Sequence, residues 1–367
     1  MKFSNDLKAY FVIVSTIIGL GIFVLPYSFW QSGYYFFFWL IFFLCSFLIL
    51  HLIFGEILFQ TKEKHNLPGL AGIYLHPLMK HLVWFFDYFG MLGVFLIYFI
   101  ALAKFWSLIL PLSPLIIKIL FAIFNLYFIF KDLRIFSQME SILTIGILIV
   151  FFFIILMILP NLNFQNIGLA LKNNSQPFLP YGILLFALSG TSAMPIVFDL
   201  IGGNKKSYFK INFFSLLTIV LLYLIYTLVV VGFLGGKVSE ESLQSLSPYL
   251  PKLFLVFAIL FVTLNITFVD MAFYLKRGLI YDYKISPKIV NLIILVSILP
   301  FAFFEPLSLI KLIDLVSEIF LGFNLLILCL IYLKLKKKEY FILPNFLILI
   351  LSLIFLSGII YGIFFAK

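Results

Sequence analysis

The sequence predicts an all-α membrane protein of about eleven transmembrane helices, arranged as two five-helix repeats of opposite orientation and one extra helix. Three observations predict this class. Hydrophobic residues make up 64% of the 367 residues and charged residues only 11%, a balance that water-soluble domains do not have. Apolar runs of about 20 residues, the length that crosses a bilayer as a helix, recur along the whole chain. Two of these runs, the first and the sixth, are interrupted by small residues and proline.

The apolar runs give the helices in order along the chain. We predict spans at 9–30, 34–60, 82–110, 114–130, 141–160, 179–201, 209–234, 249–275, 288–304, 307–332 and 340–364. One polytopic domain over 1–367 would then contain a first repeat at 9–160, a second at 179–332 and an extra C-terminal helix at 340–364. Because five is odd, the second repeat starts on the other side of the membrane from the first, so the two repeats are inverted.

Lysine and arginine are distributed very unevenly between alternate loops. One set of loops holds eighteen of them: Lys2, Lys8, Lys62, Lys64, Lys80, Lys131, Arg134, Lys205, Lys206, Lys210, Lys276, Arg277, Lys284, Lys288, Lys334, Lys336, Lys337 and Lys338. The other set holds four: Lys172, Lys237, Lys252 and Lys367. Basic residues concentrate in cytoplasmic loops, so we expect a cell-membrane protein with its N-terminus in the cytoplasm and its C-terminus outside. The net charge of +10 therefore reflects topology in a lipid bilayer, and no nucleic-acid partner is expected.

The first and sixth spans are broken at corresponding places. The first reads STIIGLGIFVLP over 15–26, and the sixth reads PYGILLFALSGTSAMP over 180–195. Glycine and proline weaken a helix, and unpaired backbone groups at membrane depth are tolerated only against protein, water or a ligand. Paired breaks in two inverted halves indicate a transporter's midplane binding site. The alternative is that the small residues only allow neighbouring helices to pack closely.

Three segments resemble signatures of the amino acid/auxin permease branch of the amino acid–polyamine–organocation superfamily, and are similar to those of aromatic amino acid permeases. They are 19–27 (GLGIFVLPY), 66–75 (NLPGLAGIYL, preceded by Gly55-Glu56) and 186–195 (FALSGTSAMP). The resemblance covers most of the first six helices and is weaker through the rest. It implies a LeuT-type inverted-repeat fold and secondary transport of amino acids. The chain departs from many relatives at Ile196, where they carry an acidic residue; Asp199 follows one turn later.

An amino acid presents a carboxylate and an ammonium group, and the two breaks offer partners for both. The start of the second half-helix of span 1 offers N–H groups and a positive dipole end to the carboxylate, and glycine lets the backbone approach it. Carbonyl groups released in both breaks would meet the ammonium. Tyr98 of span 3 is expected either to bind the carboxylate or to pack as a core aromatic, and Phe186 to gate the pocket. The expected substrate-binding residues are Ile18, Gly19, Leu20, Gly21, Ile22, Tyr98, Phe186, Ala187, Ser189 and Gly190.

The coupling ion is expected to be H⁺ or Na⁺. In sodium-coupled members of this fold, two neighbouring hydroxyls of span 8 join span-1 carbonyls around the ion. Here Thr263 stands at the first position but Leu264 at the second, which favours proton coupling or exchange; the hydroxyl alternatively satisfies a carbonyl one turn back. Acidic residues inside spans are candidate proton carriers. The candidates for ion coupling are Ser15, Ile18, Thr263, Thr267, Asp270 and Glu318.

The predicted function is therefore secondary active transport of an amino acid by alternating access, with spans 1 and 6 moving against the rest. The alternative is an amino acid-sensing receptor permease of the spore-germination type, which keeps the pocket but signals. No metal-ligand spacing or catalytic Ser/His/Asp set appears, so we expect no enzyme, no metal site and no cofactor. Glu56 is expected to tie span 2 to the loop that follows it rather than to bind substrate.

Overall fold

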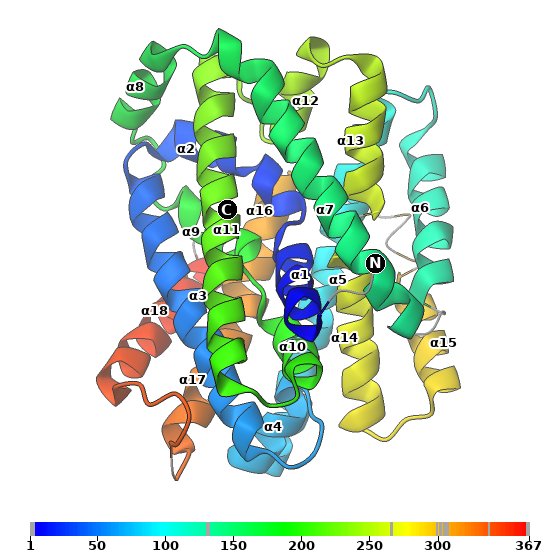
Figure 1. The fold of residues 1–367 in the computed structure, drawn as a ribbon, viewed down its shortest axis with the longest axis vertical. Helices are drawn as coiled ribbons and strands as arrows, with labels where there is room; N and C mark the ends of the chain where they lie inside the picture. The colour runs from blue at the N-terminus through cyan, green and yellow to red at the C-terminus, as the bar shows by residue number, and fades with distance from the viewer. Residues whose placement is uncertain are drawn as a thin grey trace.

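The computed structural model describes residues 4–129, 133–264, 267–298, 300, 303, 308–336 and 338–364. Every regular element in these residues is helical. The long helices run roughly side by side in one bundle, with the short helices α8 (Phe164–Lys172) and α12 (Ser242–Leu246) at one end and α4 (Leu67–Tyr74) at the other (Figure 1).

The helices follow the predicted order. The first five spans are α1 (Asn5–Ile17) with η1 (Leu20–Phe23) and α2 (Leu25–Ser32), then α3 (Tyr35–Gln60), α5 (Pro77–Ser107), α6 (Pro114–Ile129) and α7 (Leu133–Ile158). The next five are α9 (Leu179–Ala187) with η3 (Thr191–Ala193) and α10 (Met194–Ile201), then α11 (Lys205–Leu234), α13 (Lys252–Leu264) with α14 (Thr267–Tyr281), α15 (Pro287–Ile298), and α16 (Leu309–Leu315) with the π-helical η7 (Val316–Leu321) and α17 (Gly322–Lys334). The last span is α18 (Asn345–Phe364).

Seven helical stretches among the described residues are long and apolar enough to cross a membrane. They are Tyr35–Gln60, Pro77–Ser107, Ser141–Asn161, Leu179–Ile201, Lys205–Lys237, Leu309–Lys334 and Asn345–Phe364. Two shorter apolar helices, Pro114–Phe124 and Pro287–Ser297, stand where spans 4 and 9 are predicted. The first span, divided into α1 (13 residues), η1 and α2 (8 residues), is not among the seven, whereas the sixth span, Leu179–Ile201, is counted across its break.

Both predicted breaks are confirmed by the backbone. α1 ends at Ile17, and Gly19 has φ −120° and ψ −146°, outside the helical region. α9 ends at Ala187, and Gly190 has φ −129° and ψ 8°. In each span the chain resumes as a helix with proline in its first turn. N–H groups in the first turn have no acceptor within the helix, so a proline there costs no hydrogen bond.

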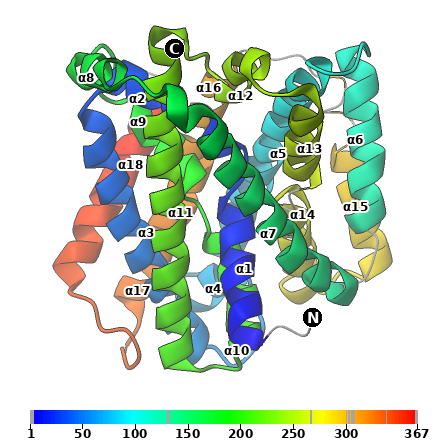
Figure 2. The same ribbon diagram turned by 45° about the horizontal axis from the view of Figure 1, so that its top comes forward.

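The two broken spans pack against each other in the middle of the bundle. α1 contacts α10 and α11, and α2 contacts α9. Figure 2 shows α1 beside α10 and α11, while α18 lies at the edge of the bundle. The breaks therefore meet inside protein, where irregular backbone is tolerated at membrane depth.

Glu56, near the C-terminal end of α3, fixes a distant loop. Its carboxylate accepts hydrogen bonds from the backbone N–H groups of Glu339, Tyr340 and Phe341, at 2.7, 2.8 and 2.5 Å. These three residues precede α18, whereas the sequence predicted a tie to the loop directly after α3. The acid thus anchors the segment before α18 to α3.

Candidate functional site

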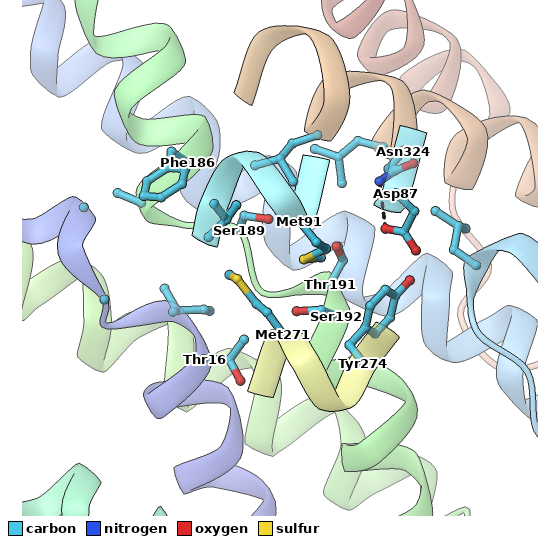
Figure 3. Close-up of a pocket in the computed structure, with 18 of the residues that line it drawn as sticks. Thr16, Asp87, Met91, Phe186, Ser189, Thr191, Ser192, Met271, Tyr274 and Asn324 are labelled. Atoms are coloured by element: carbon cyan, nitrogen blue, oxygen red, sulfur yellow. Dashed lines mark hydrogen bonds between the residues drawn. The ribbon is translucent and has the colours of Figure 1, made fainter. Parts of the chain in front are cut away.

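The two breaks open onto one cavity in the core of the bundle, shown in Figure 3. Parts of α1, α3, α5, α14, α17 and η7 complete its walls. The lining residues are Thr16, Ile17, Gly19, Leu20, Gly21, Phe54, Leu67, Asp87, Met91, Val94, Tyr98, Phe186, Ala187, Ser189, Thr191, Ser192, Met271, Tyr274, Leu321, Asn324, Leu325 and Leu328. The space between these walls is about 760 Å³, counting the part that opens outward.

Seven of the ten predicted substrate-binding residues line this cavity: Gly19, Leu20, Gly21, Tyr98, Phe186, Ala187 and Ser189. The other three, Ile18, Ile22 and Gly190, belong to the breaks but are not among the lining residues. A Cβ on Gly190 would lie 2.6 Å from Ile17 Cδ1 and 3.3 Å from His51 Cε1, so this glycine faces α1 and α3 closely. The absence of a side chain at Gly190 allows α1 and α3 to pack closely against the break.

Gly21 has two roles, because it lines the cavity and also touches the opposite break. A Cβ added to it would lie 2.7 Å from Ala187 Cβ and 2.8 Å from Ala187 Cα. Real Cβ atoms essentially never approach other heavy atoms so closely. The sequence left close contact and ligand access as alternatives, and the geometry provides for both.

A tyrosine of α11 joins the carbonyl ends of the two breaks. The hydroxyl of Tyr223 lies 2.9 Å from the carbonyl oxygen of Ile17 and 3.0 Å from that of Ala187, and it donates to them. These are the last residues of α1 and α9, where helical carbonyls lose their intrahelical partners. Tyr223 is fully buried, so the hydroxyl satisfies polar groups that would otherwise be costly.

An acidic residue that the sequence analysis missed stands at one end of the cavity. Asp87 of α5 is only 5% exposed, and its Oδ1 accepts a hydrogen bond of 3.0 Å from Asn324 Nδ2 of α17. The hydroxyl of Tyr274 points toward the same carboxylate, and Phe186 lies at the far end of the cavity (Figure 3). The amide oxygen of Asn324 is buried with no partner among the described atoms. The signal was present in the sequence, since an acid inside an apolar span is a functional candidate.

The remaining polar groups of the cavity are hydroxyls and thioethers. Thr16 donates to Val12 O at 2.7 Å. Ser189, Thr191 and Ser192 come from the sixth-span break, and two methionines, Met91 and Met271, add sulfur atoms (Figure 3). Among the described lining residues none is basic. Positive charge in the cavity therefore has a carboxylate as partner, whereas negative charge has only neutral donors, the hydroxyls and the backbone N–H groups.

The predicted ion-coupling residues do not gather in this cavity. Thr263 donates to Ile259 O at 2.7 Å and accepts from Trp106 Nε1 at 2.8 Å, in a separate pocket near the C-terminal end of α5. Ser15 is buried and donates to Val12 O at 3.1 Å, and Glu318 faces another pocket, beside α18. The side chains of Thr267 and Asp270 lie outside the described residues.

Ion pairs close the bundle above and below the cavity. At the end that carries α12, Lys104 of α5 lies 2.6 Å from Glu241. At the end that carries α4, Asp199 of α10 pairs with Arg277 of α14 at 2.9 Å and with Lys64 at 3.0 Å. Each pair joins the broken-span region or the loops to the surrounding helices.

The loop that carries α4 is held against the end of α14. Asp282 accepts from Gly69 N–H at 3.2 Å and lies 2.9 Å from His65 Nδ1. A Cβ on Gly69 would collide with this carboxylate, which explains the glycine in the predicted loop signature. Burial raises the pKa of Asp282 above its usual range, against the opposing effect of His65 and the backbone donors.

Comparison with known proteins identifies the fold. No family model matches the chain, and no curated protein sequence matches it. The structure is similar to a crystal structure of a manganese transporter from Eremococcus coleocola in complex with an aromatic bis-isothiourea substituted compound. The TM-score is 0.66 at 13% sequence identity, over 98% of this chain and 87% of that chain. The predicted fold class is thereby confirmed: this is an all-α membrane protein with the LeuT-type fold.

Proposed function

We propose that this protein is a secondary active transporter of amino acids that works by alternating access. The observation that carries the proposal is that both helix breaks line one buried cavity together with Asp87. Broken helices at the interface of inverted repeats form the substrate sites of transporters with this kind of architecture. The repeats are proposed at 9–160 and 179–332, with 340–364 as the additional helix.

The charges around the cavity suit a zwitterion. The second half of span 1 begins at Leu20, and the start of a helix attracts a carboxylate through its N–H groups and dipole. The carboxylate of Asp87 and the unpartnered amide oxygen of Asn324 attract an ammonium group. A substrate with both charges, such as an α-amino acid, satisfies both ends without a basic side chain. Tyr98 and Phe186 then contact its side chain.

A divalent metal ion is the second candidate substrate. Asp87, Asn324 and the sulfur atoms of Met91 and Met271 are all possible metal donors in one cavity, and the similar structure is a manganese transporter. Against this candidate, the described residues contain no group of three or more His, Cys, Asp or Glu that could hold a metal ion. Manganese prefers oxygen ligands, and only one carboxylate lines the cavity.

Proton coupling is proposed over sodium coupling. The hydroxyl of Thr263 already has two hydrogen-bond partners, and it lies in a pocket apart from the cavity. Asp87 is a buried acid at the cavity itself, where a proton and the substrate compete for one carboxylate. We also propose that the N-terminus is cytoplasmic, because the eighteen basic loop residues then lie inside.

The test is uptake by proteoliposomes that contain the purified full-length protein. Radiolabelled aromatic and aliphatic amino acids and radioactive manganese are supplied separately, each with an imposed proton gradient or sodium gradient. We expect concentrative amino acid uptake driven by the proton gradient. Asp87→Asn should lower uptake at least about tenfold, because hydrogen bonds to charged groups contribute about 1.5–3 kcal/mol. The control is Asp6→Asn, whose carboxylate bonds only to Ser207 in the described part of the chain.

The outcomes separate the candidates. Uptake of manganese without any amino acid would support the second candidate and reject the first. Saturable amino acid binding without uptake under either gradient would support the receptor alternative. Equal uptake by the wild type and Asp87→Asn would show that the acid at the cavity does not take part.

A further inference from the structure

A second pocket lies at the side of the bundle, between α18 and helices α3, α9 and η7. Its lining residues are Trp39, Phe178, Tyr181, Glu318, Ile354, Ser357, Gly358 and Tyr361, none of which lines the central cavity. The space between them is about 550 Å³, counting the part that opens at the surface. α18 lies at the edge of the bundle (Figure 2), so the pocket is reached from the side.

Four aromatic rings form most of the wall. Trp39 and Tyr181 meet edge to face with centroids 5.1 Å apart, Trp39 and Phe178 are 6.3 Å apart, and Phe178 and Tyr361 are 6.4 Å apart. Trp39 Nε1 donates to Pro177 O at 3.0 Å, which fixes the orientation of the indole. Rings from three different helices are thus arranged around one space.

A buried carboxylate completes the pocket. Glu318 is only 3% exposed, and its Oε2 has no hydrogen-bond partner among the described atoms. It belongs to the π-helical segment η7, and such segments are frequent at functional sites. In the described part of the chain neither Glu318 nor the neighbouring Asp314 forms a salt bridge, and Asp314 Oδ1 is also buried without a partner. A carboxylate at membrane depth requires a proton, a cation or water.

The sequence of α18 makes room for these groups. Gly358 and Gly362 lie four residues apart and therefore on one face of the helix. A Cβ on Gly362 would lie 2.9 Å from Glu318 Oε2, and one on Gly358 would lie 2.6 Å from Tyr181 Cζ. Any larger residue would press on the carboxylate or on the phenol.

We propose that this pocket binds an organic ammonium group, with Glu318 as the counter-charge and the aromatic rings as its walls. Cations are attracted to the faces of aromatic rings, and aromatic cages are the typical recognition site of alkylated ammonium ions. A metal ion fits less well, because only one carboxylate and no other strong ligand lines the space. The ammonium group belongs either to a lipid headgroup or to a free organic amine, since both carry the same chemistry.

The test is calorimetric titration of the purified full-length protein in non-ionic detergent with benzyltrimethylammonium chloride. We expect saturable binding that Glu318→Gln weakens about tenfold and that Tyr361→Leu weakens about threefold, in line with the strength of ion pairing and cation–π contact. Asp87→Asn tests the central cavity and should leave this binding unchanged. Glu63→Gln is the matched control, because Glu63 is an exposed acid. Thermal unfolding confirms that each variant is folded.

Three results would overturn the proposal. One is loss of binding in Asp87→Asn with retention in Glu318→Gln, which would move the ligand to the central cavity. The second is equal binding of benzyl alcohol, which lacks the charge. The third is the absence of saturable binding by the wild type at millimolar concentration.

Binding to the protein in nanodiscs distinguishes a lipid headgroup from a free amine as the source of the ammonium group. The ionic strength is set high enough to screen the charge of the lipid surface. If a choline headgroup occupies the pocket, benzyltrimethylammonium binds more weakly in phosphatidylcholine than in phosphatidylglycerol discs. If the ligand is a free amine, binding is equal in both. Either result supports the proposal when Glu318→Gln weakens the binding.

Discussion

The position of a Cβ on Gly21 lies 2.7 Å from Ala187 Cβ, so the breaks of the first and sixth spans are in direct contact. These residues are 166 positions apart in the chain. Because the two breaks touch, neither can change its backbone without affecting the other. Under the proposed alternating access, we therefore expect both broken spans to move as one unit.

Replacing Gly21 by alanine should therefore damage both stability and transport. The added methyl group meets the backbone of Ala187 at 2.8 Å, and overpacking of this kind costs about 1–3 kcal/mol. We expect a lower unfolding temperature and a loss of uptake of about tenfold or more. Thermal unfolding and proteoliposome uptake measure the two effects.

Gly168→Ala is the matched control for this substitution. No atom lies within 4 Å of a Cβ at Gly168, which is in the helix α8. Alanine in a helix is favoured over glycine by about 1 kcal/mol, so this variant should be at least as stable as the wild type. If Gly21→Ala and Gly168→Ala had the same unfolding temperature and the same uptake, the contact between the breaks would be important neither for stability nor for transport.

Tyr223→Phe removes the hydroxyl group that hydrogen-bonds to both breaks, and so tests the same connection by a different interaction. Without the hydroxyl, the buried carbonyl group of Ala187 loses its donor, whereas that of Ile17 keeps the hydrogen bond from Gly19 N–H. An unsatisfied buried group costs about 1–3 kcal/mol, so the variant should unfold at a lower temperature. Tyr249→Phe is the control, because Tyr249 is exposed. An unfolding temperature equal to that of the wild type would mean that other groups satisfy the carbonyls.

Local sequence features predicted the fold and the backbone of the site. Glycine and proline determine where a helix weakens, so the breaks near Gly19 and Gly190 followed from the sequence alone. The predicted spans agree with the observed helices to within a few residues at most ends. Interpretation of single polar residues was less complete. Asp87 interrupts an apolar span but was not among the predicted site residues, because only the packing of α5 against α17 shows that its side chain is buried at the cavity.

Other features depend on contacts that no local pattern contains. The hydroxyl of Tyr223 reaches two carbonyls more than 35 and 200 residues away, and this depends on how α11 packs against the breaks. Likewise, Glu318 and Thr263 lie on spans that contribute to the bundle, but the rotation of each helix determines which pocket its side chain faces. Periodicity gives the face of a helix, and only tertiary structure gives the neighbour of that face.

Glu56→Gln should release the segment before α18. The glutamate accepts three backbone N–H groups, and a glutamine amide cannot accept at both of its terminal atoms. We expect faster amide hydrogen exchange and faster proteolysis near Tyr340, with a loss of stability of about 1–3 kcal/mol. Glu63→Gln provides the control, since Glu63 is exposed. Unchanged exchange near Tyr340 would contradict the anchoring role.

The ion pairs at the two ends of the bundle should determine to which side of the membrane the cavity opens. Each pair should keep the cavity closed at its own end. Glu241→Gln removes the partner of Lys104, and Asp199→Asn removes the shared partner of Arg277 and Lys64. Partly buried charge pairs contribute on the order of 1 kcal/mol, so each change should shift the conformational equilibrium about fivefold. A cysteine at Ser189 in a Cys45→Ser, Cys329→Ala background reports access to the cavity.

We expect the Glu241 variant to speed modification of this cysteine by an impermeant reagent from the side of the membrane that carries α12. The Asp199 variant should speed it from the side that carries α4, because each substitution weakens only the exit at its own end. Glu63→Gln should leave both rates at the wild-type value. If both substitutions accelerated modification from one side, or if neither changed a rate, the ion pairs would not control the exits, and closure would depend on the apolar contacts between helices.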